Sequence, residues 1–339
     1  MLVKAIKKED LPDFIDSLVH AYEVVAPVKK EFKYAFDRIT SSGQVELEYD
    51  TTLLPPRKYL LPQKEVLLKY GMGGKSGVEA CIESGKKVIF GVHSCDLHGV
   101  WLLDDIFAEG RKDAHYLTRR DNTLIIGIDC KAPCAPNSFC KSMGTLRPGG
   151  GYDMFLTDLG DVYAVQVASQ AGRTLLDHGE FFYPDYQLKE RYYDAWKRKI
   201  AEFPDRLEFD ADRLPVMLAE AYDDFLWDAL EEKCFDCGAC TVVCPTCYCF
   251  DVQDEAEINM ERGIRYRKWD SCQLQDFALL ASGENLRGKR SDRLRHRFFR
   301  KGKYFKEKFG RFACVGCGRC GRACLVHIDV LRVFNQLKG

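Results

Sequence analysis

Two matched runs of cysteine in the last third of the chain constrain its fold more than any other feature. Each run has the spacing Cys-x2-Cys-x2-Cys-x3-Cys, which is the spacing of bacterial ferredoxins. The runs are Cys234, Cys237, Cys240 and Cys244, followed by Pro245, and then Cys314, Cys317, Cys320 and Cys324. Thiolates at intervals of three residues let a tight backbone loop hold one corner of an iron–sulfur cube. The sequence therefore predicts two [4Fe–4S] clusters.

The fourth cysteine of each run cannot easily reach the same cube as the first three, so we expect it to ligate the other cluster. The predicted ligands of cluster one are Cys234, Cys237, Cys240 and Cys324, and those of cluster two are Cys314, Cys317, Cys320 and Cys244. Small residues suit a loop whose backbone approaches the sulfides, and the runs supply Gly238, Gly316, Gly318 and Gly321. Zinc sites are the alternative, but they need two CxxC pairs, whereas each run carries four matched cysteines.

The composition limits the classes of protein to which the chain can belong. With 339 residues, 46% of them hydrophobic, it is long enough for two domains that each bury a core. Its formal net charge of −1 gives no overall field that favours nucleic acid or membrane. The N-terminus does not resemble a signal or transit peptide, and no apolar window is long enough to span a membrane. We expect a cytoplasmic protein without direct membrane insertion, in which sixteen cysteines indicate metal or redox chemistry.

The pattern of apolar residues predicts an α+β N-terminal domain (1–182), a helical connector (183–232) and an α-helical dicluster ferredoxin domain (233–339). In the first domain we expect an opening helix within 1–30, strands at 44–49, 87–92 and 124–128, a helix over 96–107, and a hairpin over 153–169. Further helices are expected over 185–203, 214–233, 273–282 and 328–337.

Four cysteines of the first domain form a candidate third cluster site: Cys95, Cys130, Cys134 and Cys140. Cys95 and Cys130 each follow the carboxyl end of a predicted strand, where ligands gather in open α/β sheets. The other two lie on the loop after Cys130. Three side chains that flank Cys95 could replace a ligand: His93, Asp96 and His98. Incidental cysteines on a loop are the alternative.

Cys247, Cys249 and Cys272 lie in the insert between the two runs. Because three thiolates without a fourth leave a metal site open, we interpret them as buried, apolar-like thiols packed near the clusters. A redox thiol, or ligands of a further cluster, are the alternatives. Cys81 stands alone, and we expect it on a helical stretch in the core.

Two segments attract a nucleotide or nucleic-acid interpretation. GMGGKSG (71–77) resembles a phosphate loop, but Lys69 stands where the pattern requires a glycine, so we expect a flexible loop. Residues 287–311 contain twelve Lys or Arg, which is compatible with nucleic-acid binding. Because a four-cysteine cubane carries net negative charge, we interpret this basic run as offsetting the clusters or docking an acidic partner.

Several segments together resemble one family. VCPTCYCFDVQDE, RKWDSCQLQDFALLASG, RLRHR and CVGCGRC occur in this order, after VHSCDLHGVWLLDDIF, RRDNTLIIGIDC, FCKSMGT and GYDMFLTDLGD. They resemble the iron–sulfur beta subunit of cytoplasmic sulfhydrogenase-type nickel–iron hydrogenases, and equally the corresponding iron–sulfur subunit of anaerobic sulfite reductase. The resemblance covers most of residues 50–335.

The resemblance implies a non-catalytic electron-transfer subunit within a hetero-oligomer. It would relay electrons between an FAD- and NAD(P)H-binding flavoprotein subunit and a catalytic oxidoreductase subunit. The chain departs from the family pattern at three places. His93-Ser94 replaces the usual Arg-Pro, Ser138 replaces a cysteine for which Cys134 could compensate, and Leu325 replaces a proline.

Other functions remain as alternatives on the sequence alone. The chain could be the electron-input subunit of a heterodisulfide-reductase-like, methylene-carrier reductase or formate dehydrogenase complex. It could be a catalytic reductase whose insert thiols act on substrate. It could also be a zinc-binding nucleic-acid module, which would be colourless and would bind DNA with a steep dependence on salt.

Overall fold

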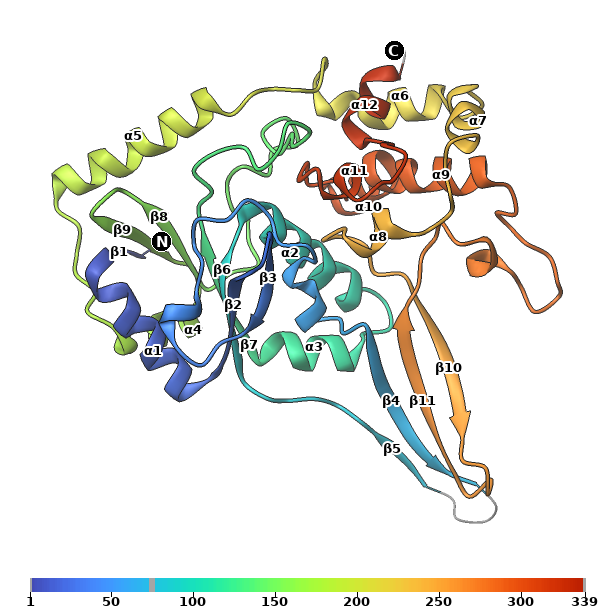
Figure 1. Cartoon of the computed structure of the whole chain (residues 1–339), viewed down its shortest axis with the longest axis horizontal. Coiled ribbons are helices and arrows are strands. Elements are labelled where there is room, and N and C mark those ends of the chain that lie inside the picture. Colours follow the sequence, from blue (N-terminus) through green and yellow to red (C-terminus); the bar gives the residue numbers. More distant parts are fainter. Residues whose placement is uncertain (1, 73–76, 338–339) are drawn as a thin grey trace.

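The N-terminal part of the chain folds around a seven-stranded mixed sheet (Figure 1). The computed structural model describes residues 2–72 and 77–337. In the order of the sheet, the strands are β1 (Leu2–Lys7), β9 (Val162–Val167), β8 (Met154–Asp158), β7 (Thr123–Ile128), β6 (Lys87–Val92), β2 (Glu23–Lys30) and β3 (Lys33–Arg38). The central strands β8, β7, β6 and β2 are parallel, and the outer pairs are antiparallel. The expected mixed sheet is thus confirmed, including its hairpin.

Helices cover both faces of this sheet, which explains why its central strands are continuous apolar runs. On one face, α1 (Leu11–Ala21) and α4 (Gln170–Thr174) lie near Val88 and Phe90 of β6, which belong to the same buried cluster as the apolar side of α1. On the other face, Ile89 packs with α2 (Ser94–Ala108) and α3 (Ala114–Asp121). The alternation of side chains along β6 therefore divides the core into two layers.

A second, four-stranded antiparallel sheet projects from the body as an arm (Figure 1). In order, its strands are β10 (Phe250–Ala256), β11 (Arg262–Trp269), β4 (Lys64–Gly71) and β5 (Val78–Ala80). The arm joins two distant parts of the sequence, because β11 from the insert between the cysteine runs pairs with β4 from the first domain. The hairpin β10–β11 departs from the helical insert that the sequence analysis expects.

The C-terminal helices pack around Trp227, Phe298 and Phe334. They are α6 (Leu214–Glu220), α7 (Leu226–Glu231), α8 (Ala239–Val242), α9 (Arg290–Phe299), α10 (Phe305–Phe309), α11 (Arg319–Arg322) and α12 (Val330–Gln336), and a π-helical turn (Arg300–Tyr304) joins α9 to α10. The connector helix α5 (Tyr186–Glu202) lies along the outside of the body (Figure 1). The helices expected at 185–203 and 328–337 are thus confirmed.

The single helix expected over 214–233 is wrong, because the chain bends between α6 and α7. The indole Nε1 of Trp227 donates to the Ala221 carbonyl (2.6 Å), and this bond satisfies a carbonyl that the bend frees from the helix. Trp227 itself is buried, so the bend places a large apolar side chain in the core.

Four further expectations differ from the structure or lie outside it. Residues 45–49 are extended but belong to no strand, and a short 3-10 turn (Gln275–Ala278) replaces the helix expected over 273–282. Cys81 follows β5 and is half-buried, so it belongs neither to a helix nor to the core. The middle of the glycine-rich loop, residues 73–76, lies outside the described residues.

Two buried arginines join the first domain to the cysteine-rich domain. Arg319 of α11 makes a bidentate ion pair with Asp96 of α2, with N–O distances of 2.6 and 2.7 Å. In the opposite direction, Arg57 donates to the carbonyls of Val242 (2.9 Å) and Cys244 (2.7 Å) at the end of α8. Each arginine therefore supplies donors to backbone or carboxylate oxygens of the other domain.

We predict that Asp96→Asn destabilises the protein strongly, because it leaves the buried Arg319 guanidinium without a counter-charge. Breaking a buried ion pair in this way costs about 3–5 kcal/mol. The free energy of unfolding in urea measures the effect. Asp37→Asn is the control, since its ion pair with Lys30 is exposed and its loss should cost no more than about 1 kcal/mol.

Candidate iron–sulfur sites

The eight cysteines of the two runs line two neighbouring cavities in the C-terminal domain. The first cavity is lined by Cys234, Cys237, Cys240 and Cys324. The second cavity is lined by Cys244, Cys314, Cys317 and Cys320. The fourth cysteine of each run thus lies at the cavity of the other run, and the thiols surround a space in which a polynuclear group fits.

The two cysteine loops have the same backbone conformation. In each, the residue before the second cysteine and the residue after it have positive φ angles: Asp236 (56°) and Gly238 (70°) in the first loop, and Gly316 (68°) and Gly318 (71°) in the second. Turns of this kind point successive N–H groups to one side, which favours an anionic group. The glycines expected from the sequence are therefore needed at these three positions.

Asp236 is the exception, because a side chain other than glycine is unfavourable at positive φ. Its carboxylate accepts from Arg290 Nε (2.9 Å) and Arg293 Nη2 (2.7 Å). These two ion pairs hold the first loop in the conformation that glycine holds in the second.

A helix with buried cations separates the two cavities. Arg297 of α9 lines both cavities, and Lys301, one turn later, lines the second. Lys301 Nζ lies 3.2 Å from Cys244 Sγ and 2.6 Å from the Thr246 hydroxyl oxygen. Arg293, Arg297 and Lys301 are spaced by four residues, so they share one face of the helix, and each is at most 5% exposed.

Arg297 provides a test of whether an anionic cluster fits these cavities. Its Nε is buried and has no hydrogen-bond partner among the described residues. A buried guanidinium without compensating charge is strongly unfavourable. The space beside Arg297 therefore requires a negatively charged acceptor, and a cubane held by four thiolates has that charge and has sulfur acceptors.

Burial keeps the free thiols of these cavities protonated. It raises the pKa of Cys240 to about 12 and that of Cys317 to about 11. In contrast, the pKa of Cys244 is lowered by its hydrogen bond with Cys247 and by the Lys301 ammonium. Because metals bind the thiolate form, loading of these sites releases protons and is unfavourable at low pH.

The four N-terminal cysteines lie at one edge of the main sheet. Cys95 is in the first turn of α2, after β6, and Cys130 follows β7, which is the parallel neighbour of β6. The Cys134 thiol interacts electrostatically with those of Cys95, Cys130 and Cys140, and Lys199 Nζ lies 3.4 Å from Cys130 Sγ. The structure thus brings the four thiols into one region, with a cation beside them.

Of the three side chains that flank Cys95, only His93 lines a cavity with Cys130 and Cys134 in the described part of the chain. Its ring is stacked on Tyr49 (4.1 Å between centroids), and burial lowers its pKa to about 3, so the imidazole is neutral. Asp96 is engaged by Arg319, and His98 Nε2 lies 2.7 Å from the Arg147 carbonyl oxygen.

The N-terminal thiol region adjoins the second cavity. Cys95 packs directly with Val315 and Cys317 of the second cysteine loop. On the other side, Phe139 N donates to the Gly316 carbonyl (2.7 Å). Gly316 allows this approach, since a Cβ there would lie 2.6 Å from the backbone of Phe139 and Cys140.

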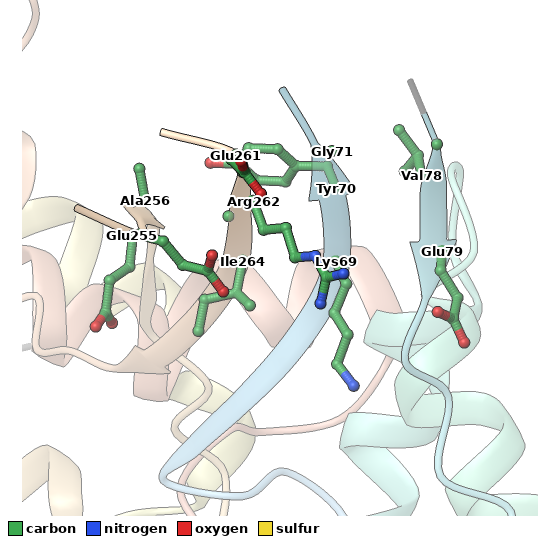
Figure 2. Close-up of a pocket in the computed structure, with 13 residues that line it drawn as sticks. Lys69, Tyr70, Gly71, Val78, Glu79, Glu255, Ala256, Glu261, Arg262 and Ile264 are labelled. Atoms are coloured by element: carbon green, nitrogen blue, oxygen red, sulfur yellow. The ribbon is translucent and has the colours of Figure 1, made fainter. Parts of the chain in front are cut away.

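A separate open pocket lies at the tip of the arm (Figure 2). Acidic and basic side chains from three strands line it, including Lys69, Glu79, Glu255 and Arg262. The described residues that line it include no cysteine, and their charges are mixed in sign. The cavities lined by several thiols therefore lie in the body and not at this tip.

Comparison with known proteins agrees with the site geometry. The family model of a 4Fe-4S dicluster domain matches residues 233–328, which contain both cysteine runs. The chain is 34% identical over 334 residues to sulfhydrogenase 2 subunit beta of Pyrococcus furiosus, a match that covers 98% of this chain and 97% of that protein. The chain belongs to the sulfhydrogenase beta-subunit family. This membership supports an iron–sulfur electron-transfer subunit that carries a [4Fe–4S] dicluster domain. No solved structure matches the chain.

Two expectations from the sequence bear on how this member of the sulfhydrogenase beta-subunit family is built. None of the helices within residues 2–72 and 77–337 is long and apolar enough to cross a bilayer. Sequence reasoning recognised the basic run but did not single out Arg297 within it. The spacing of four residues between Arg293, Arg297 and Lys301 is the signal that could have identified the buried face.

We predict that Gly316→Ala destabilises the protein more than Gly310→Ala. Both residues have φ near 70°, so both substitutions carry the cost of a left-handed side chain, about 1–2 kcal/mol. Only at Gly316 would the new Cβ clash with backbone, because no described atom lies within 4 Å of a Cβ at Gly310. Urea unfolding of the two variants measures the difference, and equal losses would contradict the proposed close packing.

Proposed function

We propose that this chain relays electrons through two [4Fe–4S] clusters between a flavoprotein subunit that binds FAD and NAD(P)H and a catalytic oxidoreductase subunit. The observation that carries the proposal is the pair of thiol-lined cavities on either side of Arg297. A cubane cluster, when bound, supplies a centre that gains and loses one electron with little rearrangement. Two such centres that share one wall offer a short path for electrons.

The proposed ligands follow the lining of the cavities. Cluster one would be held by Cys234, Cys237, Cys240 and Cys324, and cluster two by Cys314, Cys317, Cys320 and Cys244. Arg297 lines both cavities and Lys301 neutralises charge at Cys244. The loop N–H groups around Gly238 and Gly318 add further donors. These groups stabilise negative charge, and burial excludes water, so they set the potential of each cluster.

We also propose a third [4Fe–4S] cluster held by Cys95, Cys130, Cys134 and Cys140. The neighbourhood of these thiols supports it, together with Lys199 as a compensating cation and His93 as an alternative neutral ligand. Because Cys95 packs against Cys317, such a cluster would be adjacent to cluster two. The three sites would then form a line with cluster two in the middle, and electrons would enter at one end and leave at the other.

The relative supports the assignment of partners. Its printed name makes it one subunit of a sulfhydrogenase, so we propose that this chain also works in a hetero-oligomer whose catalytic component is a hydrogenase. The basic run does not support a nucleic-acid module, because Arg293, Arg297 and Lys301 are buried and cannot contact phosphates.

We predict that Cys237→Ala and Cys317→Ala each remove one cluster and block electron flow between the flavoprotein and catalytic subunits. Iron analysis should show a loss of about four irons per chain for each variant, the content of one cubane. Cys81→Ala is the control, because this half-buried thiol lies at the edge of the arm, away from the cavities. Stoichiometric zinc, or undiminished electron flow in both variants, would overturn the relay.

We predict that Arg297→Met makes the potentials of both clusters more negative, because a buried positive charge that favours the reduced state is removed. A shift of about 59 mV corresponds to a tenfold change in a one-electron equilibrium, and we expect at least this size. Redox titration followed by EPR measures the potentials. Arg295→Met is the matched control on the same helix, since Arg295 is partly exposed and pairs with Asp292. Equal shifts in the two variants would contradict the role of Arg297.

A further inference from the structure

Two cysteines outside the cavities are in direct contact with each other. Cys249 lies just before β10 and Cys272 just after β11, and Asp270 N donates to the Cys249 carbonyl (3.0 Å) at the base of the hairpin. Each thiol is hydrogen-bonded to the other. The antiparallel pairing of β10 with β11 therefore brings together two thiols that are distant in the sequence.

The arrangement of this pair differs from that of the cluster cysteines. The quartets surround cavities, whereas Cys249 and Cys272 contact each other. Among residues 2–72 and 77–337, no group of three or more His, Cys, Asp and Glu side chains is placed to hold a metal ion. The third insert cysteine, Cys247, has its hydrogen bond with Cys244 instead. Two thiols in contact favour pairwise sulfur chemistry over metal ligation.

The surroundings make the two thiols unequal. The Cys272 thiol, 4% exposed, accepts a hydrogen bond from Gln273 Nε2 (3.6 Å) and lies near Arg297 and Arg300. The hydrogen bond from Cys249, with help from these groups, lowers the pKa of Cys272 to about 6, while the pKa of Cys249 is raised. A thiolate beside a thiol is the state from which dithiols react.

The pair also borders the first cavity. Gln273, which donates to Cys272, lines that cavity, and so does Arg297. The Cys272 thiol interacts electrostatically with that of Cys240. Because Cys272 is buried, an external thiol has poor access for the in-line attack that disulfide exchange needs. Electrons are more accessible to this pair from the neighbouring cluster site than from solution.

We propose that Cys249 and Cys272 form a redox-active dithiol–disulfide pair that exchanges two electrons with the two clusters of the dicluster domain. On oxidation, the two S–H bonds break and one S–S bond forms. Two protons leave to solvent past the half-buried Cys249, and one electron passes to each of two oxidised clusters. The reverse reaction takes one electron from each reduced cluster. The identity of the electron partner rests on the proposed function, whereas the pair itself does not.

Thiol mapping of the anaerobic full-length holoprotein tests the pair. The protein is poised with mediators at oxidising or reducing potential, quenched in acid, denatured and alkylated with N-ethylmaleimide, and its peptides are weighed. We expect a disulfide between the peptides of Cys249 and Cys272 in the oxidised sample, and alkylation of both in the reduced sample. Alkylation of both cysteines at every potential would overturn the proposal.

Electron counting on variants tests the exchange with the clusters. Reductive titration of the oxidised wild-type protein should consume two more electrons per chain than that of Cys272→Ser or Cys249→Ser, and Cys81→Ser should match the wild type. Iron content should be the same in all four proteins. Equal electron counts, or a loss of about four irons per chain in the Cys249 and Cys272 variants, would overturn the proposal, the latter by making these residues cluster ligands.

The two proposals can fail separately in this experiment. A disulfide that forms in a protein without iron or EPR signal would refute the relay and leave the dithiol pair standing. Two normal clusters with no disulfide and no additional electrons would refute the pair and leave the relay standing. The thiol map of the wild-type protein decides the second case even if a serine variant does not fold.

Discussion

The burial of positive charge among thiols is the constraint on which the rest of this structure depends. Arg297, Lys301 and Arg319 are each no more than 5% exposed and lie beside the cysteines of the C-terminal domain. Within the described residues, only Arg319 of these three has a carboxylate partner, Asp96. The folded domain is thus built for anionic occupants, and cluster binding and folding are coupled because each supplies the charge that the other requires.

The same charges explain why the two domains cannot be understood separately. Arg319 belongs to the second cysteine loop, yet its counter-ion comes from the first turn of α2. Gly316 of that loop packs against the backbone before Cys140, and Arg57 binds the carbonyls at the end of α8. The second cavity is therefore enclosed by both domains. This enclosure limits the access of water to the cavity and suits a place in the middle of the proposed electron path.

The arm has a different relation to the site. Strands β4 and β11 pair across most of the sequence, and the base of the hairpin β10–β11 holds Cys249 and Cys272 beside the first cavity. The trajectory of this hairpin therefore sets the geometry of a thiol pair near a proposed cluster. Any motion of the arm on binding a partner would be felt first at that base, where backbone hydrogen bonds join the hairpin to the cysteine-rich loops.

The sequence by itself determined the features whose cause is local. The spacing of the two cysteine runs identified the cluster chemistry, the glycines marked the left-handed positions of the loops, and continuous apolar runs located β6 and β7, because all of these depend on neighbours within a few residues. Tertiary structure alone decided the hairpin insert, the break between α6 and α7, the buried partner of Asp96 and the contact between Cys249 and Cys272. Hydrogen bonds and packing between segments far apart in the chain select these features, and such contacts leave no periodic pattern in the sequence. Arg297 shows the boundary well: the basic run announced charge, but only the packing of α9 between two cavities decided which of its cations is buried.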